Sequence, residues 1–434
     1  MNNKLDEYRR DGSEIGQPGS REKGIAGYFK KTFASFQNRG YRFYYASMAG
    51  HWSSMSMLAV ARSQLAYDIT HSGAILGLVS LANAIPMLLL SIPGGFIADR
   101  LQKKTVVQLA QVGSAIFSLA VTIAILIGYL NPAHPESWWV LIACSALQGA
   151  DMGLQMPSRQ AIISELVSEK HLMNAISLNN LGMNAFRIIM PAAAGFIVDA
   201  FGPGVAYATM TLLYVSAAIT MAFVPKTTSP RRVQGRSSLA EVVDAWRYVR
   251  SEKAIFIVLI FSVFATVLGM PYVQLLPMFT SGIFDVGATG MGILITISGI
   301  GAILGSFIIA SLSNRRRATL MLVFALIMSA ALLGFAFSNW WYLSLFLIMF
   351  VGGGNTGQMA LGNSLVQYYV KADYRGRVLS FYMMGFGLGS LGAFFAGILA
   401  EAIGVQWAVG GMAFVLLVIT SMMFFMTPRL RKLD

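Results

Sequence analysis

The sequence is poor in charge and nearly free of cysteine. Only 12% of its 434 residues are charged, and Cys144 is its single cysteine. Soluble domains carry about 25% charged residues, so a water-soluble enzyme is strongly disfavoured, and the low charge also disfavours a disordered chain. One cysteine within an apolar run forms neither an intrachain disulfide nor a metal site. The first 40 residues lack the pattern of a cleavable signal peptide, and none is expected.

Apolar residues are abundant instead, at 56% of the chain. That share is about 240 residues, enough for roughly twelve membrane-spanning helices of about 20 residues each. Apolar runs predict a first set of helices at 41–67, 72–98, 105–130, 137–160, 173–200 and 204–224. A second set is predicted at 254–281, 286–312, 318–337, 340–366, 377–402 and 405–427. The predicted fold is an all-α integral membrane protein with twelve transmembrane helices in two six-helix bundles.

The few charges are unevenly placed. Lys and Arg number 32 against 19 Asp and Glu, which gives a net charge of +13. With the N-terminus inside, nearly all basic residues fall in inner segments, and the short outer loops contain no Lys or Arg. Because this is the positive-inside pattern, both termini are expected in the cytoplasm of a multi-pass protein of the cell's inner (plasma) membrane. Topology explains the positive charge, and no nucleic-acid partner is expected.

The chain is expected to divide into five parts. These are a cytoplasmic N-terminal segment at 1–40, an N-terminal six-helix bundle at 41–224, a cytoplasmic linker at 225–253, a C-terminal six-helix bundle at 254–427 and a cytoplasmic tail at 428–434. Within the linker, apolar residues recur at three- and four-residue spacing from Leu239 to Val249. This spacing predicts an amphipathic helix on the inner surface.

The two halves repeat each other. Gly182 and Asp199 in the first half match Gly385 and Glu401 about 200 residues later. Two halves in the same orientation form a parallel repeat, and proteins built this way rock about a site at the membrane midplane between the halves.

A charged loop follows the second predicted helix. It contains, in order, Gly95, Asp99, Arg100, Lys103 and Lys104. Topology alone explains the three bases but not Asp99. The block resembles the loop motif of the major facilitator superfamily, with Gln102 in place of the usual second glycine. The resemblance implies that Asp99 locks the two bundles on the cytoplasmic side, and we place Arg159 and Glu165 in the same cytoplasmic gate.

A second group of motifs narrows the resemblance. Met156-Pro-Ser-Arg159 with Glu165, and the later Asn184 and Arg187, resemble the branch that contains enterobactin exporters and macrolide efflux proteins. Members of that branch are exporters driven by proton influx, so the resemblance implies proton-coupled efflux. The segment 187–195 also resembles a degenerate antiporter motif of the superfamily, with Met190 where glycine is expected.

Four ionisable residues fall inside predicted spans: His51, Arg62, Asp151 and Arg187. A charge at the membrane centre costs about 2.5–3.5 kcal/mol on insertion scales, so these residues are functional hypotheses by default. Helical spacing puts them on polar stripes of three helices of the first half, which need a shared polar space. Three interpretations remain open. Asp151 forms a structural ion pair with Arg187 or Arg62, or Asp151 carries a proton, or His51 does, since imidazole titrates near neutral pH.

A further set of polar and methionine side chains is expected to line a substrate cavity. Its members are Met55, Gln148, Met152, Gln155, Asn180, Asn184, Gln274, Asn355 and Gln358. Flexible methionines suit a site that accepts several amphipathic molecules. The second half has no charged residue in mid-span, so any titrating group is expected in the first half.

The sequence therefore favours a secondary active transporter. We expect proton-coupled efflux, by antiport and alternating access, of amphipathic small molecules such as drugs, macrolides or siderophores. A lipid or lysolipid transporter of the same fold and a non-transporting membrane sensor stay open as alternatives. No catalytic set or phosphate loop occurs at a workable depth, so neither enzymatic activity nor a metal or cofactor is expected. The expected partners are the substrate, protons and membrane lipids, and the chain is expected to be a monomer.

Overall fold

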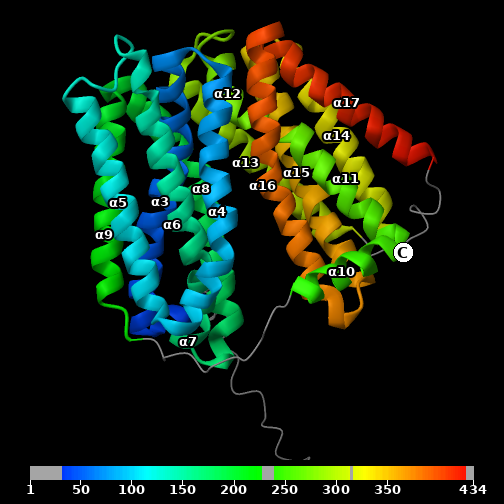
Figure 1. Cartoon of the computed structure of the whole chain (residues 1–434), viewed down its shortest axis with the longest axis horizontal. Coiled ribbons are helices and arrows are strands. Elements are labelled where there is room, and N and C mark those ends of the chain that lie inside the picture. The colour runs from blue at the N-terminus through cyan, green and yellow to red at the C-terminus, as the bar shows by residue number, and fades with distance from the viewer. Residues whose placement is uncertain (1–31, 227–238, 313–315, 427–434) are drawn as a thin grey trace, which may run out of the picture.

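The computed structural model describes residues 32–226, 239–312 and 316–426, and the regular structure of these residues is helical (Figure 1). The long helices of the first half are α3 (Arg39–Thr70), α4 (Gly73–Arg100), α5 (Lys103–Leu126), α6 (Trp138–Ala161), α8 (Glu169–Phe201) and α9 (Pro203–Ala222). The helices of the second half are α11 (Lys253–Gly269), α12 (Tyr272–Thr280), α13 (Gly287–Ser311), α14 (Arg317–Phe337), α15 (Trp341–Tyr369), α16 (Ala372–Ile403) and α17 (Val405–Met426). Shorter helices are η2 (Ala34–Gln37), η3 (Pro135–Ser137), α7 (Ile163–Leu166) and α10 (Leu239–Ser251).

Ten helical segments of the described chain are long and apolar enough to cross a membrane. Helices α11 and α12 form one of these segments together, whereas α3 and α6 are not among them. These two helices carry His51, Arg62 and Asp151. Helix α3 packs against α8 and α9, and α6 packs against α4 and α5. The most polar long helices of the first half are therefore packed against more apolar helices.

One predicted helix is broken in the structure. The sequence predicted a continuous helix over 254–281, but α11 ends at Gly269 and α12 begins at Tyr272. Pro271 lies at the break and has no backbone N–H to continue the helical hydrogen bonds. The prediction of one continuous helix was wrong because a single proline in an otherwise apolar run was not taken as a helix end.

Helix α10 lies in the linker, in the segment where an amphipathic helix was predicted. The Trp246 ring contacts Phe256 of α11 and Phe381 of α16, with centroid distances of 6.4 and 5.7 Å. Tyr248 stacks on Tyr374 at 4.4 Å. The apolar face of α10 is thus packed against the second half of the molecule.

Within each half, glycines allow two helices to cross at backbone contact. A Cβ added to Gly149 of α6 would lie 2.0 Å from the carbonyl oxygen of Asn83 in α4. In the second half, a Cβ added to Gly352 of α15 would lie 1.9 Å from the carbonyl oxygen of Ser298 in α13. Such crossings exclude larger side chains, so each half is a closely packed unit.

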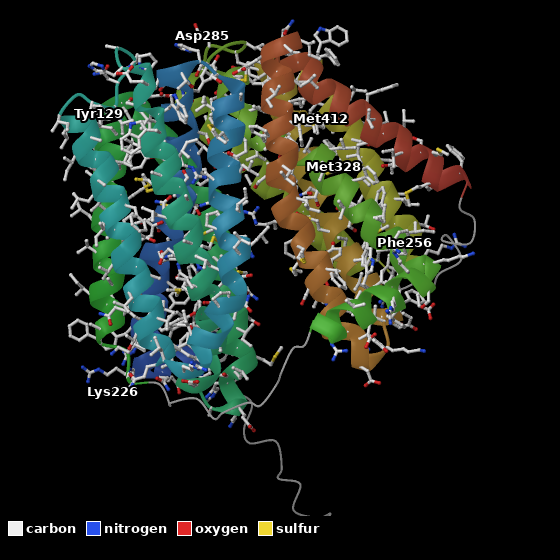
Figure 2. The ribbon with its side chains drawn as sticks, in the orientation of Figure 1. Tyr129, Lys226, Phe256, Asp285, Met328 and Met412 are labelled. Carbon is white, nitrogen blue, oxygen red and sulfur yellow. The ribbon has the colours of Figure 1, made fainter. Side chains whose placement is uncertain are left out.

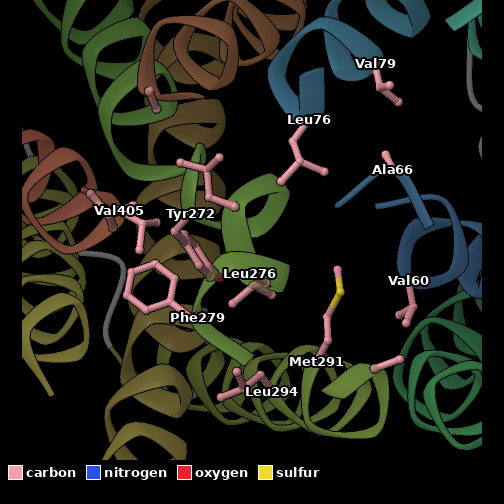
Figure 3. Packing of buried hydrophobic residues seen from close by; sticks show 14 of the residues in the cluster. Val60, Ala66, Leu76, Val79, Tyr272, Leu276, Phe279, Met291, Leu294 and Val405 are labelled. Atoms are coloured by element: carbon pink, nitrogen blue, oxygen red, sulfur yellow. The ribbon is translucent and has the colours of Figure 1, made fainter. Parts of the chain in front are cut away.

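Among the described residues, the two halves share an apolar core toward one end of the molecule and not toward the other. We call the end with Tyr129 and Asp285 the far end and the end with Lys226 the linker end (Figure 2). One apolar cluster, toward the far end, includes residues of both halves, such as Leu76 of α4 and Leu276 of α12 (Figure 3). Toward the linker end, each half has its own cluster.

Hydrogen bonds between the halves also lie toward the far end. Ser63 Oγ donates to Gln274 Oε1 over 3.4 Å, and Thr296 Oγ1 donates to the Ile188 carbonyl oxygen over 2.6 Å. Ser80 Oγ and Ser390 Oγ are 3.1 Å apart. The ribbons of the two halves diverge toward the linker end (Figure 1). The structure is therefore closed at the far end.

Candidate functional site

The polar stripes of α3 and α6 meet inside the first half. Arg159 Nη1 of α6 donates to His51 Nε2 of α3 over 3.2 Å, and Arg62 Nη1 donates to Ser145 Oγ over 3.3 Å. His51 is 4% exposed. Because a guanidinium only donates hydrogen bonds, this contact requires the neutral imidazole with its hydrogen on Nδ1. His51 therefore holds no charge in this arrangement.

Asp151 faces a different neighbour. Ser114 Oγ of α5 donates to Asp151 Oδ2 over 2.7 Å. The salt bridges found in the described part of the chain do not include Asp151, so the ion pair with Arg62 or Arg187, one of the three interpretations, is not formed here. The carboxyl group lies in the bundle beside a hydroxyl rather than beside a cation.

Several buried polar atoms around this site have no hydrogen-bond partner among the residues that the structure describes. They are His51 Nδ1, Arg62 Nε, Gln155 Oε1 and Ser158 Oγ. Gln155 is 2% exposed and Gln148 is 9% exposed. Leaving a buried polar atom unpaired costs about 1–3 kcal/mol, so native proteins retain such groups where they serve a purpose. These atoms are suited to bind water, a proton or polar atoms of a substrate.

The polar stripe of α8 does not join those of α3 and α6. Asn180, Asn184 and Arg187 are exposed. Helical spacing puts Asn180 and Asn184 on the same face of α8 as Ile188, which contacts α13 of the other half. Arg187 follows Asn180 by seven residues, about two helical turns, and so lies on nearly the same side of α8. This stripe therefore lies along the face that α8 presents to the second half.

The remaining predicted cavity residues divide by exposure. Met55 is 39% exposed, whereas Met152 and Asn355 are half-buried. Gln274 accepts the hydrogen bond from Ser63 and so lies between the halves. Gln358 is 1% exposed, and its Nε2 has no hydrogen-bond partner within the described ranges.

Most predicted gate residues make contacts within the first half. Lys103 of α5 forms a salt bridge with Glu165 of α7, and Lys104 Nζ donates to the carbonyl oxygens of Ala222 and Val224 at the end of α9. Arg159 binds His51, as described above. Gly95 is half-buried and Arg100 is exposed. The side chain of Asp99 lies outside the described part of the structure, so its predicted locking role stays a prediction.

Replacing Lys103 by Met is expected to destabilise the first half. The Lys103 and Glu165 side chains are only 14% and 18% exposed, and Glu165 Oε2 has no hydrogen-bond partner in the described part of the chain. Loss of the cation would leave a mostly buried carboxylate unpaired and lower the free energy of unfolding by about 1–3 kcal/mol. The measurement is the melting temperature in detergent. A double variant with Glu at position 103 and Lys at position 165 keeps the ion pair and should recover most of the lost stability. An unchanged melting temperature in Lys103→Met would contradict a stabilising role for this salt bridge.

Sequence reasoning missed two residues that join the halves. Asp199 and Glu401 were noted as matching positions of the repeat, and no role was given to them. In the structure, each carboxylate accepts hydrogen bonds from the other half. Their equivalent positions in the two halves were the available signal.

A helical membrane protein with two repeated halves, joined at one end and with a buried polar set between helices, has the architecture of a membrane transporter. The chain belongs to the Transmembrane secretion effector family of the major facilitator superfamily, whose profile matches residues 30–434. It is therefore a multi-pass inner-membrane transporter and not an enzyme, as the motifs indicated.

Relatives and solved structures agree with this membership. The chain is 26% identical over 365 residues to the Staphyloferrin A transporter of Staphylococcus aureus, covering 83% of this chain and 89% of that protein. It is 21% identical over 405 residues to Macrolide efflux protein A of Streptococcus pyogenes, covering 90% and 97%. A solved variant of the nucleoside transporter NupG has the same fold, with a TM-score of 0.70 at 16% identity over 89% of this chain and all 100% of that one.

Proposed function

We propose that this transporter exports amphipathic small molecules in exchange for protons by alternating access. In this proposal twelve segments span the membrane as two six-helix bundles, 41–224 and 254–427, and both termini are cytoplasmic. The positive-inside pattern supports this orientation, in which the far end faces outward. The structure then corresponds to a state closed to the outside.

The observation that supports proton coupling most directly is the position of Asp151. Its carboxyl group lies inside the first half and accepts a hydrogen bond from Ser114. In a membrane interior an ionisable group that is not neutralised by a partner is a functional hypothesis. Such a carboxyl can bind and release one proton per cycle. The inward movement of that proton releases roughly 2.3 kcal/mol per 100 mV of membrane potential.

Two observations support an amphipathic substrate. The unpaired polar atoms of His51, Arg62 and Gln155 offer hydrogen bonds from the first half. Polarisable methionines such as Met55 and Met152 adapt to apolar groups of different shape. The names of the relatives, which include a macrolide efflux protein, favour export of such molecules.

A liposome experiment tests the proposal. The purified full chain is reconstituted with the pH dye pyranine inside, a pH gradient is imposed, and erythromycin or ethidium is added as the probe. We expect probe movement that discharges the gradient and stops when an ionophore collapses it. Equal probe movement with and without the gradient would contradict proton coupling. Movement of a fluorescent lysolipid, with neither probe moved, would contradict the proposed substrate class.

A further inference from the structure

The carboxylate of Asp199 lies at the start of a helix of the other half. Asp199 stands in the last turn of α8, and α13 begins at Gly287. The backbone N–H of Ala288 donates to Asp199 Oδ1 over 3.1 Å, and that of Thr289 donates to Oδ2 over 2.7 Å. Both oxygens thus bind N–H groups that have no partner within their own helix.

Glu401 makes the same kind of contact in the opposite direction. It stands in the last turn of α16 in the second half, and α4 of the first half begins at Gly73. The N–H of Ala74 donates to Glu401 Oε1 over 3.1 Å, and Ser72 Oγ donates to the same oxygen. Ser72 is the N-cap residue of α4, so Glu401 binds both the first turn of this helix and its cap.

These contacts form a reciprocal pair. The sequence repeat makes Asp199 and Glu401 equivalent, so each half contributes one carboxylate and receives the other. The N-terminus of a helix attracts negative charge because its unpaired N–H groups and the helix dipole point toward it. Each carboxylate therefore favours the arrangement in which the halves touch at the far end.

Glycine at position 287 fits this contact. Gly287 has a backbone φ of +59°, which residues other than glycine rarely adopt. A Cβ at this position would lie 3.0 Å from both carboxylate oxygens of Asp199. The backbone at the start of α13 is thus shaped so that the carboxylate can approach its N–H groups.

We propose that Asp199 and Glu401 act as gating residues of the transport cycle, a far-end latch that holds the outer side closed until the halves rock apart. The inference rests on alternating access, which is part of the proposed function. Both carboxylates are exposed at the far end, and the hydrogen bonds found for them among the described residues do not involve the partly buried site around Asp151. The latch therefore sets the balance between the two states and leaves the polar site unchanged.

Distance measurements between spin labels test the latch without any substrate. In a Cys144→Ser background, one pair of labels is placed on exposed far-end loops at Ala133 and Asn339, and another at Lys170 and Asp373 at the linker end.

Because the contribution of one exposed carboxylate at a helix end is modest, Asp199→Asn and Glu401→Gln should each raise the ratio of far-open to far-closed molecules about threefold, and together about tenfold. The far-end distances should lengthen while the linker-end distances shorten. Gly287→Ala, which keeps the carboxylate and disturbs its approach, should act in the same direction.

The matched control is Glu136→Gln. Glu136 is an exposed far-end carboxylate that pairs with His134 of its own half, so its neutralisation should leave both distance distributions unchanged. Distributions of the double variant that superimpose on those of the wild type would overturn the latch. Gradient-driven transport by the wild-type chain is measured separately, so the latch and the proposed function can fail independently.

Discussion

Replacing Asp151 by Asn is expected to reduce gradient-driven transport at least about a hundredfold while leaving downhill exchange of the probe nearly unchanged. The amide has almost the same shape as the carboxyl and can still accept the hydrogen bond of Ser114, so the packing around α6 should persist. An amide binds no proton at neutral pH, so coupling is lost while the shape of the side chain is kept. The two rates are measured in liposomes with a pH gradient and with a probe gradient alone.

A second variant separates Asp151 from the competing proton carrier. His51→Gln keeps a group that can accept a hydrogen bond from Arg159 and removes the titrating ring. If Asp151 carries the proton, His51→Gln should still respond to the gradient. Gradient-driven transport by Asp151→Asn at the wild-type rate, with loss in His51→Gln, would assign the proton to His51 instead.

Replacing Gly292 by Val is expected to abolish transport because the far end can no longer close. A Cβ at Gly292 of α13 would lie 2.3 Å from the carbonyl oxygen of Pro191 in α8, and a Cβ at Gly195 would lie 2.2 Å from that of Ala288. No side-chain rotation relieves a clash with backbone, so the two halves must separate there. We expect the far-end label distances to stay long in this variant and probe movement to fall to the background of empty liposomes.

Two other glycines control for the effect of the substitution itself. Nothing lies within 4 Å of a Cβ added to Gly411 of α17, so Gly411→Val should transport like the wild type. Gly352→Val places a side chain against α13 inside the second half and should reduce the yield of folded protein. Gly292→Val is expected to fold, because its clash lies between the halves. Transport by Gly292→Val at the wild-type rate would contradict the need for backbone contact between α8 and α13 when the far end closes.

Sequence periodicity predicted the helices well because a membrane imposes long apolar runs with charged ends. Each predicted segment coincides with helical structure, and the one clear error, at Pro271, came from a residue whose effect depends on its exact position in a span. The amphipathic helix α10 was predicted for the same reason, since a helix on a bundle surface must alternate apolar and polar faces.

The contacts of the site could not be predicted in the same way. Spacing placed Asp151 and Arg159 on one stripe of α6, yet Asp151 contacts α5 and Arg159 contacts His51 of α3. The rotation of a helix about its axis depends on packing with all of its neighbours, and a stripe about 80° wide can face two of them. The repeat at Asp199 and Glu401 was visible in the sequence, but only the crossing of the halves shows what these carboxylates bind.

The apolar cluster shared by the two halves also has a thermal consequence. Opening the far end would divide this cluster, and water entering from that side would hydrate side chains such as Leu76 and Leu276. Exposure of apolar surface to water raises the heat capacity. The contribution of this cluster to the enthalpy and entropy of far-end opening therefore changes with temperature.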